Sequence, residues 1–304
     1  MSLDVVRRPV AGGAARLEFR AMGSAVGVVV LGLRGGEALV AAECRALVEE
    51  LETLLSRFLA ASDVGRLNGG GGRPVAVDGR TDWVLREALR LFELTGGACD
   101  PVIGALVEAW EAGGGARAGV DGARLRSVEA GSWLLEPGAK VDLGGLAKGY
   151  AADAARDLCR ERGAAGALVT LGTSSVAVFG AHPGGRPWRV GLRALGGAAG
   201  ASIGWLELES GALSSSSRTF RGALDPASGQ PACSDVGTVS VASASGMVAE
   251  AWSTAILVRG SDWAWDRYRA AAGTADAFEA VIQTDDRLLA TPGLRPRLHL
   301  SLRP

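Results

Sequence analysis

The middle of the sequence holds a series of short, largely apolar segments separated by Gly, Ser and Pro residues. We expect each of them to be a β-strand: 167–171, 175–179, 188–192, 203–208 and 238–242. A parallel pair of strands needs a crossover of a dozen or more residues, and most of these connections are shorter than that. The spacing therefore predicts antiparallel sheets at the centre of the fold.

Helices are expected on both sides of this region. Between positions 37 and 58, apolar residues recur at helical spacing and glutamates occupy the other face. The same reasoning predicts helices over 81–94, from Gly145 to 163, over 248–258, and over 262–272 with Ser261 as a cap. Val26, Val28 and Val30 predict a buried strand after a turn at 22–24. A hairpin at 285–286 and a strand near Leu298 are expected to close the chain.

The fold class predicted from this mixture is α+β, with mixed or antiparallel sheets flanked by helices. No repeat of solenoid period and no long linker divide the chain, so we expect one domain over 1–304. Residues 1–14 are expected to form a flexible N-terminal segment. The glycine-rich residues at 111–123 are expected to form a flexible insertion.

Charge and histidine content exclude several kinds of function. The 304 residues include 32 basic and 33 acidic side chains, which leaves a net charge of −1. A nearly neutral chain lacks the positive field that holds phosphate backbones, so no nucleic-acid partner is expected. The only two histidines, His182 and His299, lie far apart in the sequence. Carboxylates, hydroxyls and backbone groups must therefore carry any chemistry.

The cysteines and the N-terminus bear on the compartment. Cys44, Cys99, Cys159 and Cys233 form no CxxC pair, and we interpret them as buried small hydrophobes. No apolar leader opens the chain and no apolar run is long enough to be a transmembrane segment. A soluble, cytoplasmic protein is therefore expected, although a leader removed from the chain would leave the same pattern.

The run VDLGGLAKGYAAD at 141–153 predicts an anion-binding turn. Asp142 and two glycines precede a helix whose first turns carry Lys148. Exposed N–H groups and the helix dipole attract anions at such a place, and a lysine adds a full positive charge. The competing interpretation is a tight turn beside a solvated lysine.

A second candidate site lies in AEAWSTAIL at 249–257. Glu250 and Thr254 are four residues apart on a predicted helix and therefore face the same way. Their hard oxygen ligands suit Mg²⁺. Taken alone, however, this spacing is more typical of an ordinary pair on a helix surface. The serines at 214–217 are interpreted as a loop before the turn-forming DPASGQP, and His182 as a loop residue.

Taken together and in order, these stretches resemble the ApbE family, the FAD:protein FMN transferases. The resemblance covers roughly positions 19 to 284. It rests on AMGS, SRF with SDVGRLN, GACDPVIGALVEAW, VDLGGLAKGYAAD, GAHPGGRPWRVGL, LDPASGQP and AEAWSTAIL. It implies an α+β fold with FAD bound across its middle and Mg²⁺ beside the pyrophosphate.

The resemblance also implies roles for individual residues. Positions implied to contact FAD are Met22, Phe58, Ala98, Cys99, Asp100, Asp142, Lys148 and Leu224. Positions implied to hold the metal are the backbone of Gly145 and the side chains of Glu250 and Thr254, and the last two are also the expected catalytic residues. In the implied reaction, a Thr or Ser hydroxyl of an acceptor protein attacks the FMN phosphorus of FAD and AMP leaves.

Three places depart from the family pattern. Glu250 stands where Asp is usual, Gly222 where a His is usual, and Thr173 and Ser174 replace a Gly-Asp pair. His182 would substitute for the missing histidine only if the fold brings it near. These departures keep two alternatives open: an FAD-binding protein without turnover, and a Mg²⁺-dependent enzyme that hydrolyses FAD to FMN and AMP.

Overall fold

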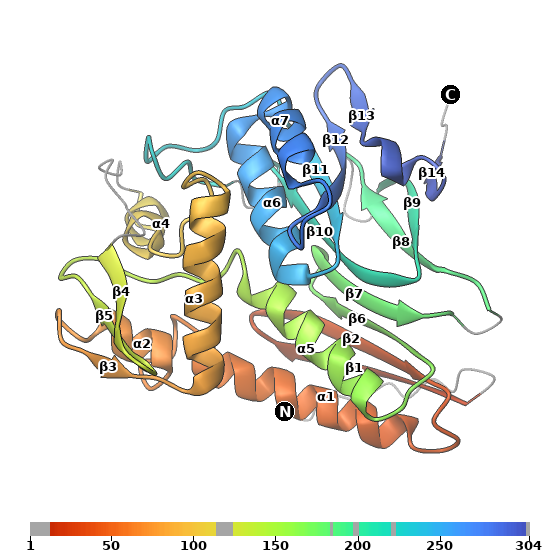
Figure 1. Ribbon diagram of the computed structural model, residues 1–304, viewed down its shortest axis with the longest axis horizontal. Coiled ribbons are helices and arrows are strands. Elements are labelled where there is room, and N and C mark those ends of the chain that lie inside the picture. Colours follow the sequence, from red (N-terminus) through yellow and green to blue (C-terminus); the bar gives the residue numbers. More distant parts are fainter. Residues whose placement is uncertain (1–12, 114–123, 183–184, 197–200, 220–222, 302–304) are drawn as a thin grey trace.

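A computed structural model describes residues 13–113, 124–182, 185–196, 201–219 and 223–301 (Figure 1). Its main element is an eight-stranded sheet in the order β1-β2-β6-β7-β10-β11-β12-β13, in which every neighbouring pair is antiparallel. The strands are β1 Ala14–Ala21, β2 Ser24–Leu31, β6 Gly166–Leu171, β7 Ser175–Gly180, β10 Ser210–Ser217, β11 Thr238–Ser243, β12 Phe278–Gln283 and β13 Leu288–Ala290.

Two three-stranded sheets accompany the main one. The first has the order β14-β9-β8, with β14 Leu298–Leu300, β9 Ser202–Leu208 and β8 Trp188–Arg193. The second has the order β3-β5-β4, with β3 Val75–Ala76, β5 Ser132–Leu135 and β4 Leu125–Glu129. These pairings are also antiparallel, so the predicted α+β class with antiparallel sheets is confirmed.

Helices cover one face of the main sheet. The helices of the described residues are α1 Glu37–Leu55, α2 Asp63–Asn68, α3 Gly79–Leu94, α4 Gly104–Glu111, α5 Ala147–Glu161, α6 Gly246–Arg259 and α7 Ser261–Ala271, with a 3₁₀ turn at Pro292–Leu294. Of these, α1, α5, α6 and α7 contact the main sheet. Figure 1 shows α1, α5 and α6 lying across the strands. Alternate residues of β2, Val26, Val28 and Val30, are buried in the same apolar core as these helices.

The other face of the main sheet is partly covered by the sheet β14-β9-β8. Trp188, Val190 and Leu206 form a second apolar core with Val178 and Leu213 from the main sheet. Helices therefore lie on one side of β7 and β10 and strands on the other. Both strands are consequently buried, and a polar side chain on either must find a partner inside the protein.

The structure corrects several sequence-based expectations. Serines 214–217 form part of β10, in the interior of the main sheet, rather than a loop. The Ser214 hydroxyl bonds to that of Ser253 in α6, and the Ser215 hydroxyl bonds to that of Ser240 in β11. Because the strand consists of serines here, its sequence shows no apolar alternation. Ser261 does not cap α7, because Gly260 is the N-cap and the Ser261 hydroxyl donates to Asp235. The helices α2 and α4 were not expected.

The two segments expected to be flexible, 1–14 and 111–123, lie mostly outside the described residues. Strand β1 already includes Ala14, while 1–12 lie outside the described residues. Helix α4 ends at Glu111, and 114–123 also lie outside them. Within the part of the chain that is described, no helix has both the length and the apolar character needed to cross a bilayer.

Candidate functional site

The turn before α5 is held in place by contacts with distant segments. The side chain of Asn68 bonds to both backbone groups of Val141, at 2.7 and 3.0 Å. The amide of Asp142 donates to the carbonyl of Pro101 over 2.9 Å. As predicted, the helix begins just after the two glycines, and it starts without a side-chain cap. No side chain at its N-cap position therefore satisfies the free N–H groups of its first turn.

The polar side chains of this turn bond within it. Asp142 Oδ1 accepts a hydrogen bond of 2.7 Å from the amide of Gly144. Lys148 Nζ donates to the carbonyl of Gly144 over 2.9 Å, which places its charge beside the turn. The acid, the glycines and the lysine therefore lie together at this turn. Asp142 and Lys148 each bond to the backbone of Gly144 rather than to each other.

Helix α6 crosses α5 beside this turn. A Cβ atom added at Gly149 would lie 2.3 Å from the carbonyl oxygen of Gly246, so the two backbones pack without intervening side chains. One turn before Gly149, a Cβ atom added at Gly145 would lie 3.8 Å from Thr254 Oγ1. The predicted metal-binding positions Gly145 and Thr254 therefore lie close together, although they are far apart in the sequence.

Glu250 lies on the same helix and is almost completely buried, with 4% of its surface exposed. The hydroxyl of Ser175, the first residue of β7, donates to Glu250 Oε1. The second carboxylate oxygen, Oε2, is buried and has no hydrogen-bond partner among the described residues. An unpaired carboxylate oxygen inside a protein is costly, which makes this atom the most unusual feature of the site.

The segment 98–100 lies next to Glu250. Burial and the negative charges of Glu250 and Asp100 raise the pKa of the Cys99 thiol to about 12, so this thiol is neutral at physiological pH. Thr95 Oγ1 accepts from the Cys99 amide over 3.1 Å, and Asp100 Oδ1 accepts from the Val102 amide over 2.7 Å. Two carboxylates and an inert thiol thus share one buried place.

The neighbouring predicted positions pack around this segment. Ala98 forms a small apolar cluster with Ala255 and Val258 of α6, and Ala223 packs against that cluster. Leu224, the next residue, is buried and forms an isolated bridge with Pro231 across the DPASGQP turn. The predicted contact positions Ala98 and Leu224 are therefore near each other and near α6.

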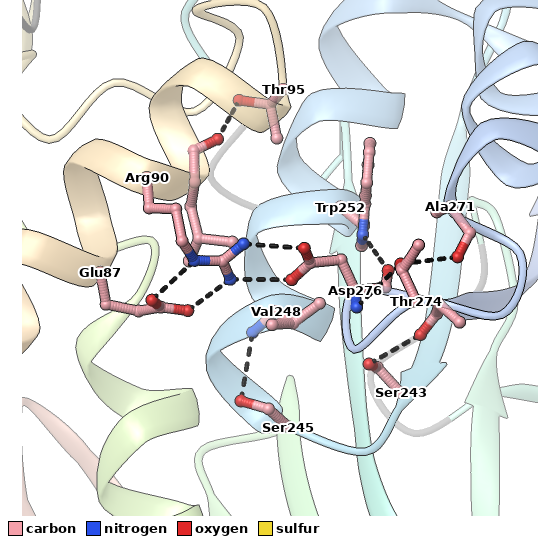
Figure 2. A network of polar contacts seen from close by, with 12 residues as sticks. Glu87, Arg90, Thr95, Ser243, Ser245, Val248, Trp252, Ala271, Thr274 and Asp276 are labelled. Carbon is pink, nitrogen blue, oxygen red and sulfur yellow. Dashed lines mark hydrogen bonds and ion pairs between the residues drawn. The ribbon is translucent and has the colours of Figure 1, made fainter.

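A polar network anchors α3, the helix that leads into the segment 98–100 (Figure 2). Arg90 pairs with Asp276, at 2.8 Å for both guanidinium nitrogens, and also with Glu87 of its own helix. The carbonyl of Asp276 accepts from Trp252 Nε1 of α6 over 2.9 Å. Helix α3 is thus fastened to α6 at a point two residues beyond Glu250.

Arg57 and Phe58 lie beside the turn that precedes α5. Arg57 Nε lies 3.0 Å from Asp142 Oδ2, and Arg57 also pairs with Glu111 of α4 at 3.0 Å. The guanidinium carbon sits 4.3 Å from the centre of the Phe58 ring, which is 79% exposed. A largely exposed aromatic ring beside a turn suited to anions offers a stacking surface for a planar ligand.

Sequence reasoning missed Arg57 and Ser175. Arg57 was visible only as the middle residue of SRF, and Ser175 only as the start of a predicted strand.

Met22, a predicted FAD contact, lies in the β1–β2 turn with φ 52°. This turn lies next to the 172–174 turn that precedes Ser175, because the Gly172 amide donates to the carbonyl of Ala25 over 2.7 Å.

His182, which was considered as a substitute for the missing histidine, does not lie at this site. His182 lines a hollow of about 400 Å³ on the face of the main sheet opposite the helices, beside Arg16 and Thr170. It therefore does not replace the missing histidine. Gly222 lies outside the described residues, and Cys233 is exposed rather than buried because it follows a surface turn.

The site's ligands differ from those of a metal centre built from acidic, cysteine or histidine side chains. Within the described residues, no three His, Cys, Asp or Glu side chains group so as to hold a metal ion. Glu250 and Thr254 lie one turn apart on α6, and Thr254 Oγ1 lies close to Gly145. An ion held here would therefore have only oxygen ligands, which is what Mg²⁺ prefers.

Several known proteins are similar to this chain in sequence. FAD:protein FMN transferases are among the similar proteins: one from Klebsiella pneumoniae is 26% identical over 87% of this chain and 89% of its own length. Another, from Rhodobacter capsulatus, is 30% identical over 75% of this chain and 47% of its own.

Solved structures agree on the fold. The ApbE protein of Thermotoga maritima superposes with a TM-score of 0.83 at 24% identity, over 94% of this chain and 99% of that one. The flavin transferase ApbE from Vibrio cholerae gives 0.81 at 24% identity, over 94% and 99%. The model of the ApbE family matches residues 22–278, and this chain belongs to that family.

Proposed function

We propose that this protein is a Mg²⁺-dependent FAD:protein FMN transferase, which moves FMN from FAD to a Thr or Ser hydroxyl of an acceptor protein. Membership of the ApbE family and the names of its relatives support the reaction class. The observation that carries the proposal is the buried, unpaired Glu250 Oε2 next to the uncapped start of α5.

The residues present fit a magnesium ion. An orphaned carboxylate oxygen, a hydroxyl and a backbone carbonyl are hard ligands, and Glu250, Thr254 and Gly145 supply them. When bound, such an ion withdraws charge from phosphoryl oxygens and so favours attack at phosphorus. Because Cys99 is neutral and no acid–histidine pair occurs at the site, the nucleophile is expected to arrive with the acceptor.

This chain's own residues would bind and orient FAD. The start of α5 and Lys148 would supply the positive charge that stabilises an anionic pyrophosphate. Phe58 offers an exposed ring for stacking, and Ala98 and Leu224, which lie near α6, would contact the nucleotide. Asp142, held by Arg57 and the Gly144 amide, keeps the turn in shape.

The reaction balances without a further reactant. The acceptor oxygen forms a bond to the FMN phosphorus while the pyrophosphate bond to AMP breaks, and the hydroxyl proton is released. The leaving AMP carries away the electron pair of the broken bond. Positive charge at the helix start and beside the pyrophosphate would stabilise the phosphoryl oxygens as this happens.

Calorimetric titration of FAD with and without Mg²⁺, followed by an assay for AMP and mass spectrometry of a co-expressed acceptor domain, tests the proposal. A transferase gives an acceptor heavier by one FMN and releases one AMP for each. Release of AMP without an acceptor would identify FAD hydrolysis instead. Binding of FAD with an unmodified acceptor and no AMP would identify a binding protein.

Glu250→Gln tests the metal assignment, because it keeps the size of the side chain and removes the charge. We expect it to lose Mg²⁺-dependent transfer by at least about a hundredfold, as for other removed metal ligands and electrostatic groups. Glu49→Gln, an exposed change on α1, is the matched control and should leave the rate unchanged. Equal rates for both variants would refute the role of Glu250.

A further inference from the structure

The contact between Ser175 and Glu250 joins two residues whose side chains are both buried. Ser175 is 1% exposed and opens β7, where it pairs with Leu171 of β6 and Ser214 of β10. Its hydroxyl donates to Glu250 Oε1 and also lies 3.3 Å from the hydroxyl of Ser174. Ser174 can therefore donate to Ser175 while Ser175 donates to the carboxylate.

This bond leaves the two oxygens of Glu250 in different states. Oε1 accepts a hydrogen bond from Ser175. Oε2 is buried away from solvent and has no hydrogen-bond partner among the described residues. A glutamate has one more rotatable bond than an aspartate, so its carboxylate needs an additional contact to stay in one orientation. Ser175 supplies that contact from the strand facing the helix.

We infer that Ser175 is a positioning residue: its hydroxyl holds the Glu250 carboxylate so that Oε2 is presented to a divalent cation. The inference rests on the proposed function, because it concerns the same ion. Groups that hydrogen-bond to a metal ligand commonly change metal affinity ten- to a hundredfold when removed. The hydroxyl does not touch the ion itself, so its effect is exerted only through Glu250.

Metal affinity itself provides the test, independent of any turnover. Mn²⁺ takes the same oxygen ligands as Mg²⁺, and its free concentration is read from its electron paramagnetic resonance signal. The full-length protein is titrated with Mn²⁺ as wild type, Ser175→Ala, Ser175→Thr and Ser215→Ala. Ser215 bonds to Ser240 over 2.7 Å in the neighbouring strand and does not contact Glu250, so it is the matched control.

We expect Ser175→Ala to bind Mn²⁺ about tenfold or more weakly, and Ser175→Thr, which keeps the hydroxyl, to bind within about threefold of wild type. Ser215→Ala should bind like wild type. Unchanged affinity in Ser175→Ala, with binding lost in Glu250→Gln, would overturn the inference and leave the proposed function standing. A wild-type protein that binds no Mn²⁺ would instead refute the metal-dependent function, and the inference with it.

A second pair of variants separates positioning from general support of the fold. Aspartate at position 250 is too short to reach Ser175 in the same way, so Ser175→Ala should have little further effect on Mn²⁺ affinity in the Glu250→Asp background. A loss of the same factor in both backgrounds would mean that Ser175 acts through the fold rather than through Glu250. Thermal unfolding without metal checks that every variant is folded.

Discussion

Gly149 of α5 and Gly246 of α6 meet backbone to backbone. A Cβ atom at position 149 would lie 2.3 Å from the carbonyl oxygen and 2.4 Å from the carbonyl carbon of Gly246, and 2.8 Å from the amide nitrogen of Met247. All three atoms belong to the backbone and cannot move aside by rotation of a side chain. This crossing brings the start of α5, with Gly145, next to Glu250 and Thr254.

Gly149→Ala is therefore expected to push the two helices apart. Forcing a methyl group into packed backbone costs about 1–3 kcal/mol, and the better helix propensity of alanine offsets at most about 1 kcal/mol of that. Urea unfolding should show a protein less stable by about 1–2 kcal/mol. Mn²⁺ affinity should fall as well, because Gly145 and Thr254 separate.

The matched control for this change is Gly79→Ala. Gly79 also lies in a helix, at the start of α3, and a Cβ atom there has no neighbour within 4 Å. We expect this variant to be as stable as wild type or slightly more so. If Gly149→Ala were equally stable, the close crossing of α5 and α6 would not be what holds the site together.

Arg57→Ala is expected to weaken FAD binding. The guanidinium lies 3.0 Å from Asp142, and its removal leaves that carboxylate without its cation beside the place where a pyrophosphate would bind. Loss of one charge at such a distance corresponds to about a tenfold loss of affinity for a dianion. Titration of FAD at low and high salt measures it, and the difference from wild type should shrink as salt screens the charge.

Arg45→Ala serves as the control for Arg57. Arg45 of α1 forms an exposed pair with Glu49 at 2.7 Å, so FAD affinity should not change. A similar affinity of Arg57→Ala and Arg45→Ala for FAD would show that Arg57 serves only to link α4 to the turn.

Asp82 is expected to contribute to stability in a pH-dependent way. The Arg86 side chain, hydrogen-bonded to both carboxylate oxygens, lowers the pKa of Asp82 below its ordinary value of 3.8, and Trp133 Nε1, 2.7 Å away, acts in the same direction. The folded state therefore favours the charged form. This contribution is present above the ordinary pKa and is lost as the pH falls through the lowered one.

Asp82→Asn should accordingly destabilise the protein at neutral pH, with a difference from wild type that narrows as the pH falls below 3.8. Urea unfolding at pH 7, about 5 and about 3 measures the trend. Asp266→Asn, in an exposed pair with Arg269, is the control and should be nearly neutral throughout. A difference between Asp82→Asn and wild type that does not vary with pH would contradict the assignment.

Several elements of the fold could be predicted because their pattern is local. The apolar period of 37–58 and the alternation of Val26, Val28 and Val30 each reflect one face turned to the core, and the stop after Leu94 reflects the glycines that follow. The predicted helix was three residues too long, because α1 ends at Leu55. Strand β10 could not be predicted in this way, because serines 214–217 are satisfied by hydroxyls on α6 and β11 that no local pattern shows. The missing side-chain cap of α7 was not foreseen for the same reason, because Ser261 bonds to the distant Asp235.

The sequence by itself determined the fold class, the helix that begins after Gly145, and the residue types of the site, because periodicity, turn chemistry and ordered motifs act over a few neighbouring residues. Only the tertiary structure decided which of those residues meet. Ser175 and Glu250 are 75 positions apart, and Arg57 pairs with Asp142 although three helices separate them in the chain. Such contacts depend on how elements cross, as at Gly149 and Gly246, and packing between distant segments leaves no signature in either one.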